Sequence, residues 1–169
     1  MKKSELVFLG DSLTMRHNWS NFKASNMGID GDTIDGILSR VHMTSEAKTI
    51  VLMAGVNDIL NRVPLIKIQK TYIRMFESFG KEQNIYILSL LPVIDDKQTK
   101  TINQEIRTLN NWLQNEVKKR NATYINLHSS FLDTQKKGLK RIFTTDGIHL
   151  TAKAYIVWEK ILKEMLKED

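Results

Sequence analysis

The sequence of 169 residues contains no cysteine. Without thiol groups the chain can form neither a disulfide nor a thiolate nucleophile, and cysteine-ligated zinc and iron–sulfur sites are excluded as well. The histidines do not follow a metal-binding spacing such as H-E-x-x-H, so we expect no metal and no cofactor. A chain free of cysteine suits a reducing compartment, and we expect a cytoplasmic location.

Long apolar runs are absent too. The apolar run at residues 6–9 is followed directly by Gly10-Asp11-Ser12. This run is too short for a signal peptide or a membrane helix. The formal net charge is +6, but no basic motif interleaved with aromatic residues accompanies the lysines. We therefore expect no transmembrane segment and no nucleic-acid partner, whereas a homo-oligomer is compatible with the sequence.

Length and composition fit one folded domain over residues 1–169. Hydrophobic residues make up 41% of the chain and charged residues 26%, which is ordinary for globular proteins. A chain of this length buries roughly 70% of the surface that its extended form exposes. The sequence has no linker, repeat or low-complexity segment that would mark a second domain.

Apolar runs of strand length alternate with segments of helical periodicity, as in repeated β–α units around a parallel sheet. The expected strands are Glu5–Leu9, Phe22–Asn26, Thr49–Met53, Ile85–Leu90 and Thr123–Leu127. Amphipathic patterns predict helices over residues 34–41, 65–79, 102–117 and 151–165. The sequence thus predicts an α/β protein, a three-layer α/β/α fold with a doubly wound, flavodoxin-like, five-stranded parallel sheet.

Ligands of such folds bind beyond the carboxyl ends of the strands. Polar, glycine-bearing turns at residues 10–12, 28–33 and 55–58 follow the first three expected strands, and a fourth at 146–149 precedes the last helix. We expect these turns to meet at one edge of the sheet. Trp19 follows the first turn, and we expect its ring to border the pocket.

The turns hold the residue types that nucleophilic catalysis requires. A serine hydroxyl needs a base within hydrogen-bond reach, a group that orients the base, and donors for the developing oxyanion. Ser12 lies between a strand and a helix start, and Asp146 and His149 share a turn in which the carboxylate can orient the imidazole. Taken singly, such residues are more often helix caps and turn formers, but here they occur together at one predicted edge.

The segments Gly10-Asp11-Ser12-Leu13-Thr14, Gly28-Ile29-Asp30-Gly31-Asp32-Thr33, Gly55-Val56-Asn57-Asp58 and Asp146-Gly147-Ile148-His149-Leu150 resemble, in order and separation, the successive blocks of the GDSL/SGNH hydrolases. The resemblance covers residues 10–150. It implies that Ser12 is the nucleophile, His149 the general base and Asp146 its orienting group. It also implies an oxyanion hole formed by the backbone N–H groups of Ser12 and Gly31 and the side-chain amide of Asn57.

Three further residues have supporting roles in this interpretation. Gly28 is an alternative to Gly31 as the second backbone donor, because the block contains both glycines. Gly31 is preferred since it directly precedes Asp32-Thr33, as in the family's block. Asp11 and Asp58 are expected to hold their loops by accepting backbone hydrogen bonds.

The resulting prediction is a serine esterase that hydrolyses carboxylic esters or thioesters of short to medium acyl chains through an acyl-enzyme. An acyltransferase or a sugar O-deacetylase on the same scaffold stays open, as does a non-catalytic flavodoxin-like module that binds phosphate at residues 10–14. A nucleophile elbow of the α/β-hydrolases is disfavoured, because it requires Gly-x-Ser-x-Gly and no glycine follows Ser12 at that spacing.

Overall fold

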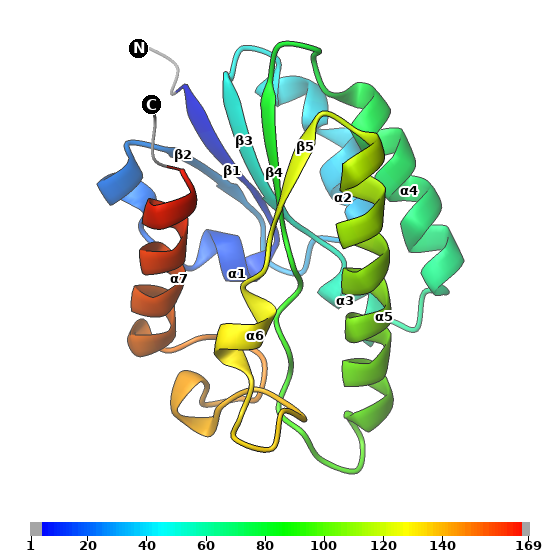
Figure 1. Ribbon diagram of the computed structural model, residues 1–169, viewed down its shortest axis with the longest axis vertical. Helices are drawn as coiled ribbons and strands as arrows, with labels where there is room; N and C mark the ends of the chain where they lie inside the picture. Colours follow the sequence, from blue (N-terminus) through cyan, green and yellow to red (C-terminus); the bar gives the residue numbers. More distant parts are fainter. Residues whose placement is uncertain (1–4, 167–169) are drawn as a thin grey trace.

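A computed structural model of the protein describes residues 5–166. Its centre is a sheet with helices packed on both faces (Figure 1). The strands are β1 (Leu6–Gly10), β2 (Ser25–Gly28), β3 (Thr49–Met53), β4 (Asn84–Leu88) and β5 (Ala122–Ile125). All neighbours pair in parallel, in the order β2-β1-β3-β4-β5. This is the predicted doubly wound, flavodoxin-like sheet.

Successive strand residues point to opposite faces of the sheet, and helices cover both faces, so the central strands β1 and β3 are buried on both sides. In β1, Val7 and Leu9 belong to one apolar core, whereas Phe8 belongs to the other. The residues of β3 alternate in the same way. Ile50 and Leu52 belong to the first core, and Val51 and Met53 belong to the second. These near-continuous apolar strands form the middle layer of the three-layer fold.

The helices divide between the two cores. The first core lies under α2 (Ile34–Ser39), α3 (Val56–Leu60), α4 (Leu65–Ser78) and α5 (Lys100–Glu116), and the second under α1 (Ser12–Met15), α6 (His128–Phe131) and α7 (Ala152–Met165). Short 3₁₀ helices are η1 (Trp19–Phe22), η2 (Val41–Thr44), η3 (Val117–Lys119) and η4 (Arg141–Phe143). Among residues 5–166, none of these helices combines the length and apolarity that crossing a membrane requires.

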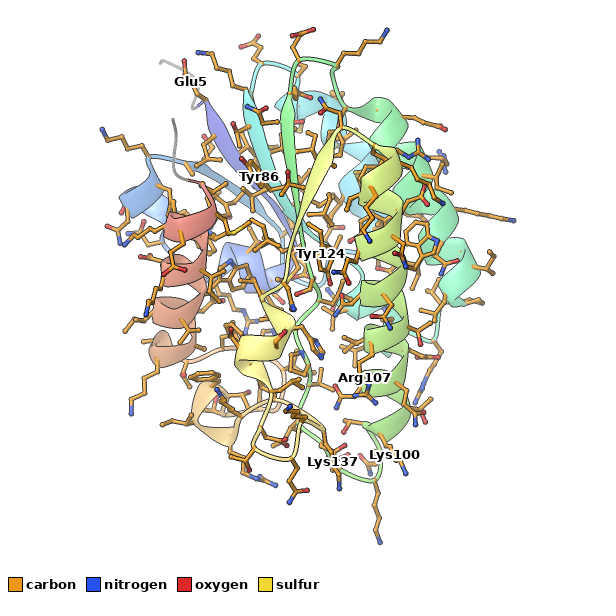
Figure 2. All side chains as sticks on the ribbon, in the orientation of Figure 1. Glu5, Tyr86, Lys100, Arg107, Tyr124 and Lys137 are labelled. Carbon is orange, nitrogen blue, oxygen red and sulfur yellow. The ribbon has the colours of Figure 1, made fainter. Side chains whose placement is uncertain are left out.

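The sheet has an amino end and a carboxyl end with different side chains around them. In Figure 2, Glu5 lies at the amino end, whereas Lys100, Arg107 and Lys137 lie at the opposite end. There Arg107 of α5 donates from Nη1 to the carbonyl oxygen of Lys137 over 3.5 Å. This hydrogen bond connects α5 to the segment around Lys137 at the carboxyl end of the sheet.

Two sequence-based predictions were wrong around the second strand. Phe22 does not begin it: Phe22 ends η1, and Lys23 adopts a left-handed conformation with φ 51°, so that β2 begins only at Ser25. Trp19 does not border a pocket. Its ring is buried against Phe8, with ring centroids 4.2 Å apart, and its indole N–H donates to the carbonyl oxygen of Thr14. The aromatic ring is part of the second core.

Other boundaries differ by a few residues. The expected strand Thr49–Met53 matches β3 in both bounds, whereas β1, β4 and β5 are offset from or shorter than the expected strands. The helix expected over residues 34–41 ends at Ser39, and a separate 3₁₀ helix begins at Val41. Arg40 lies at this break, where it caps α2 with its backbone N–H.

Candidate active site

Ser12 is the first residue of α1, just beyond the carboxyl end of β1. Asp11 caps the helix, because its Oδ1 accepts a hydrogen bond of 2.9 Å from the Leu13 N–H. The N–H groups of a helical first turn have no acceptor within the helix. The N–H of Ser12 is consequently available, and its side chain lies at the edge of the sheet where the strands end.

A chain of hydrogen bonds joins Ser12 to two residues from the far end of the sequence. Ser12 Oγ lies 3.1 Å from His149 Nε2, and His149 Nδ1 lies 2.6 Å from Asp146 Oδ2. A proton must lie between Nδ1 and the carboxylate, since both would otherwise present lone pairs to each other. In the neutral ring, Nε2 therefore carries no proton and can accept the Ser12 hydroxyl proton.

The turn around Asp146 holds the imidazole in place. Asp146 Oδ1 accepts the backbone N–H groups of Ile148 and His149, at 2.9 and 2.7 Å, which leaves Oδ2 for the ring. Partial burial opposes ionisation of Asp146, but the hydrogen bonds from the His149 ring and from these N–H groups outweigh it and hold its pKa below the usual value. The carboxylate of Asp146 therefore stays charged and remains a hydrogen-bond acceptor for the His149 ring.

Two neighbouring segments support this turn. Gly147, at φ +90°, donates its N–H to Thr144 Oγ1 over 2.9 Å, and its carbonyl oxygen accepts the Ile94 N–H over 2.8 Å. Ile94 belongs to the loop that follows β4. The turn is thus attached to the same sheet edge as Ser12.

The glycines of residues 28–33 differ in their surroundings. The Gly28 N–H is engaged, because it donates to Asn26 Oδ1 over 2.9 Å. Gly31 has φ +72°, and its N–H donates no hydrogen bond to any group within residues 5–166. Asn57, at the start of α3, donates from Nδ2 to the carbonyl oxygen of Asp32 over 2.8 Å. Gly31 and Asn57 thus lie on segments that are joined by a hydrogen bond. The N–H of Gly31 and the second N–H of the Asn57 amide have no acceptor within residues 5–166.

Asp11 and Asp58 are both buried carboxyls. Asp58 Oδ2 accepts the Ile34 N–H over 3.0 Å and so attaches α2 to α3, while Asp11 caps α1. Burial raises the pKa of Asp58, although the backbone hydrogen bond opposes the shift. Burial also raises the pKa of Asp11 to about 7, with the nearby carboxylate of Asp32 acting in the same direction. Among the described atoms, Asp11 Oδ2 has no hydrogen-bond partner.

One residue of this edge was not identified from the sequence. Arg40 donates hydrogen bonds to Gly10, Met27 and Asp32, which lie on three different segments. The sequence pattern around Arg40, at the end of a short amphipathic helix, predicts an ordinary exposed surface residue. The spacing of eight residues to Asp32 also matches no intrahelical pair.

The chain is similar to proteins of known family and structure. The model of the family described as GDSL-like Lipase/Acylhydrolase matches residues 8–156. Similar solved structures include a GDSL-like lipase from Bacteroides thetaiotaomicron, with 23% identity, a TM-score of 0.84, and coverage of 95% of this chain and 86% of that one. No curated protein matches the chain significantly.

Two further structures extend the comparison. A lipolytic protein of the G-D-S-L family from Veillonella parvula shares 18% identity, with a TM-score of 0.82 and coverage of 97% of this chain and 98% of that one. A catalytic mutant of an acetylxylan esterase from Geobacillus stearothermophilus shares 12%, with a TM-score of 0.83 and coverage of 97% and 94%. At these identities the likeness establishes the common fold.

Proposed function

The chain belongs to the GDSL-like lipase/acylhydrolase family, a class of hydrolases that act on esters, and we propose that it is a serine esterase with Ser12 as its nucleophile. The observation that carries the proposal is the hydrogen-bonded chain from Ser12 Oγ through the His149 ring to the Asp146 carboxylate. A hydroxyl, a base and an orienting carboxylate in this order are the parts that acyl transfer to serine requires.

In the first half-reaction, Ser12 Oγ attacks the carbonyl carbon of the ester while its proton passes to His149 Nε2. Asp146 stabilises the resulting imidazolium through the hydrogen bond to Nδ1. The tetrahedral intermediate then collapses, the bond to the leaving alcohol or thiol breaks, and His149 returns the proton to that group. The product of this step is an acyl-enzyme on Ser12.

The oxyanion of the intermediate needs donors on the face opposite the imidazole. We assign the backbone N–H groups of Ser12 and Gly31 and the Nδ2 group of Asn57 to this role. The engaged N–H of Gly28 supports Gly31 over Gly28 as the second donor. The hydrogen bond from Asn57 to Asp32 fixes the orientation of the amide, whose second N–H is left for the substrate.

In the second half-reaction, a water molecule takes the place of the leaving group. His149 accepts a proton from this water as its oxygen attacks the acyl carbon, and then protonates Ser12 Oγ as the acid departs. If an alcohol or a sugar hydroxyl replaces water, the same acyl-enzyme gives acyl transfer. Product analysis with and without an added acceptor distinguishes the two outcomes.

We propose short to medium acyl chains as substrates. The side chains of His149 and Asp146 are 28% and 51% exposed, so the imidazole and the carboxylate lie at the surface beside the buried Ser12. A carboxylic ester or thioester with a small acyl group reaches this position without an enclosed channel. Acetylated sugars are a second candidate, because an acetylxylan esterase shares the fold.

The proposal is tested with para-nitrophenyl esters from acetate to laurate, alongside an acetylated xylo-oligosaccharide and an acyl-CoA. We expect hydrolysis that is fastest with acetyl and butyryl groups and that disappears in Ser12→Ala. If the wild-type protein were no faster than Ser12→Ala with every ester, the esterase would be ruled out. Binding of inorganic phosphate at residues 10–14 would then favour a non-catalytic module.

A further inference from the structure

Arg40 is a nearly buried cation at the edge of the sheet. Its Nη1 donates to the carbonyl oxygen of Met27 over 2.7 Å, and its Nη2 donates to that of Gly10 over 2.9 Å. Its Nε and Nη2 both donate to Asp32 Oδ2, at 3.0 and 2.8 Å. The two side chains are only 12% and 13% exposed, so water screens the pair weakly.

Each acceptor of Arg40 adjoins a segment with a proposed oxyanion donor. Gly10 ends β1, two residues before Ser12, and Asp32 directly follows Gly31. The carbonyl oxygen of Asp32 in turn accepts the amide of Asn57. A single guanidinium therefore connects the segments of all three donors, although it belongs to none of them.

The carboxylate of Asp32 is fixed on its other side as well. Its Oδ1 accepts the Thr33 N–H over 2.9 Å and occupies the space that a Cβ atom on Gly36 would need. The absence of a side chain at Gly36 thus lets Asp32 fold against the first turn of α2. Because both Nε and Nη2 donate to this carboxylate, Asp32 holds the guanidinium of Arg40 beside α2.

We propose that Arg40 is a positioning residue for ester hydrolysis, which acts through Asp32 to hold Gly31 and Asn57 where the substrate oxyanion forms. The inference rests on the proposed function, since it assigns a role within that reaction. A planar guanidinium can donate in several directions at once, whereas a lysine ammonium cannot reproduce its fork. The ion pair between Arg16, at the end of α1, and Asp30, on the loop that holds Asp32, is exposed and contributes little.

The test replaces Arg40 by lysine, which keeps a cation beside Asp32 and avoids an unpaired buried carboxylate. We expect kcat for para-nitrophenyl acetate to fall about tenfold to a hundredfold, because misplaced donors stabilise the transition state poorly, while KM changes less than about twofold. Arg120→Lys is the matched control. Its pair with Glu116, 29% and 7% exposed, lies before β5 at the amino end of the sheet, and we expect its kcat to stay within about twofold of wild type.

A boronic acid separates positioning from loss of folded protein. The boron atom bonds to Ser12 Oγ, the hydroxyl proton passes to His149, and a boronate oxygen takes the place of the substrate oxyanion. We expect Ki for methylboronic acid to rise in Arg40→Lys by the factor by which kcat/KM falls. A smaller folded fraction would lower the apparent kcat and leave Ki unchanged.

The outcomes are distinct. Three results overturn the positioning role, given an active wild-type enzyme. The first is a kcat of Arg40→Lys within twofold of the wild-type value. The others are a loss of kcat with an unchanged Ki, and an equal loss of kcat in Arg120→Lys. A wild-type protein without esterase activity overturns the proposed function itself. Should Arg40→Lys fail to fold, Asp32→Asn is measured in the same way, and the same joint change of kcat/KM and Ki is expected.

Discussion

A Cβ atom on Gly28 would lie 2.6 Å from the Cα atom of Met15 and 2.8 Å from the carbonyl oxygen of Asp11. The end of β2 therefore passes directly against the backbone of α1, the helix that begins with Ser12. The N–H of Gly28 is meanwhile bonded to Asn26. Gly28 is needed for the close approach of two backbones. Of the two glycines, it is Gly31 whose N–H donates to no group within residues 5–166.

The two glycines respond differently to substitution by alanine. Gly28→Ala should lower the free energy of unfolding by about 3 kcal/mol, because the new methyl group meets backbone atoms that cannot move aside without shifting α1. At Gly31 no atom lies within 4 Å of the added Cβ, and the strain of φ +72° alone should cost about 1 kcal/mol. Urea unfolding of both variants measures the difference, and equal losses would contradict it.

Asn57→Ala should lower kcat about a hundredfold or more with a smaller effect on KM, because one donor to the oxyanion is removed. The measurement is steady-state hydrolysis of para-nitrophenyl acetate. Asn121→Ala, an exposed amide between η3 and β5, is the control and should leave kcat unchanged. An Asn57→Ala enzyme with full kcat would remove Asn57 from the oxyanion hole.

Asp146→Asn should lower kcat/KM about a thousandfold or more, because a neutral amide neither stabilises the imidazolium nor fixes the required tautomer. Asp96 offers a matched control. Its Oδ1 also accepts two backbone N–H groups, from Gln98 and Thr99, but no histidine ring contacts it. Asp96→Asn should therefore change only the local turn. Similar kinetic losses in both variants would show that Asp146 merely shapes its loop.

Asp11 should make stability depend on pH. Its pKa is about 7 in the folded protein, raised mainly by burial, and near 4 in the unfolded chain. Between these values folding takes up a proton, so the contribution of Asp11 to the free energy of unfolding falls as the pH rises from 4 to 7 and is constant above 7. Asp11→Asn lacks this titration.

The stability of Asp11→Asn relative to wild type should consequently increase by a few kcal/mol between pH 4 and pH 7. Urea unfolding of both proteins across this range measures the change. Other groups titrate in both proteins and cancel in the difference. A difference that does not vary with pH would contradict a raised pKa for this carboxyl.

The fold followed from local patterns in the sequence. Strand-length apolar runs and helical periodicity give the alternation of elements, and Thr49–Met53 was predicted in both bounds because both of its faces are buried. Phe22 was misassigned because an aromatic residue favours strands by propensity. The left-handed turn at Lys23, which ends η1 before β2 begins, has no glycine or asparagine to signal it.

The site was less predictable where its contacts are nonlocal. Ser12, Asp146 and His149 could be selected as candidates from the sequence because their residue types and order match known blocks, and the structure joins them by hydrogen bonds. Arg40 was missed, since its three acceptors come from separate segments that meet only in the folded protein. The burial of Trp19 was missed too, because its partner Phe8 lies on a neighbouring element.

The most direct test of the central claim is labelling with a serine-directed fluorophosphonate, followed by peptide mass spectrometry. We predict one phosphonyl group per protein, attached to Ser12, at a rate that falls sharply in His149→Ala and is zero in Ser12→Ala. Labelling of another serine, or labelling of Ser12 that does not depend on His149, would contradict the proposed nucleophile and base.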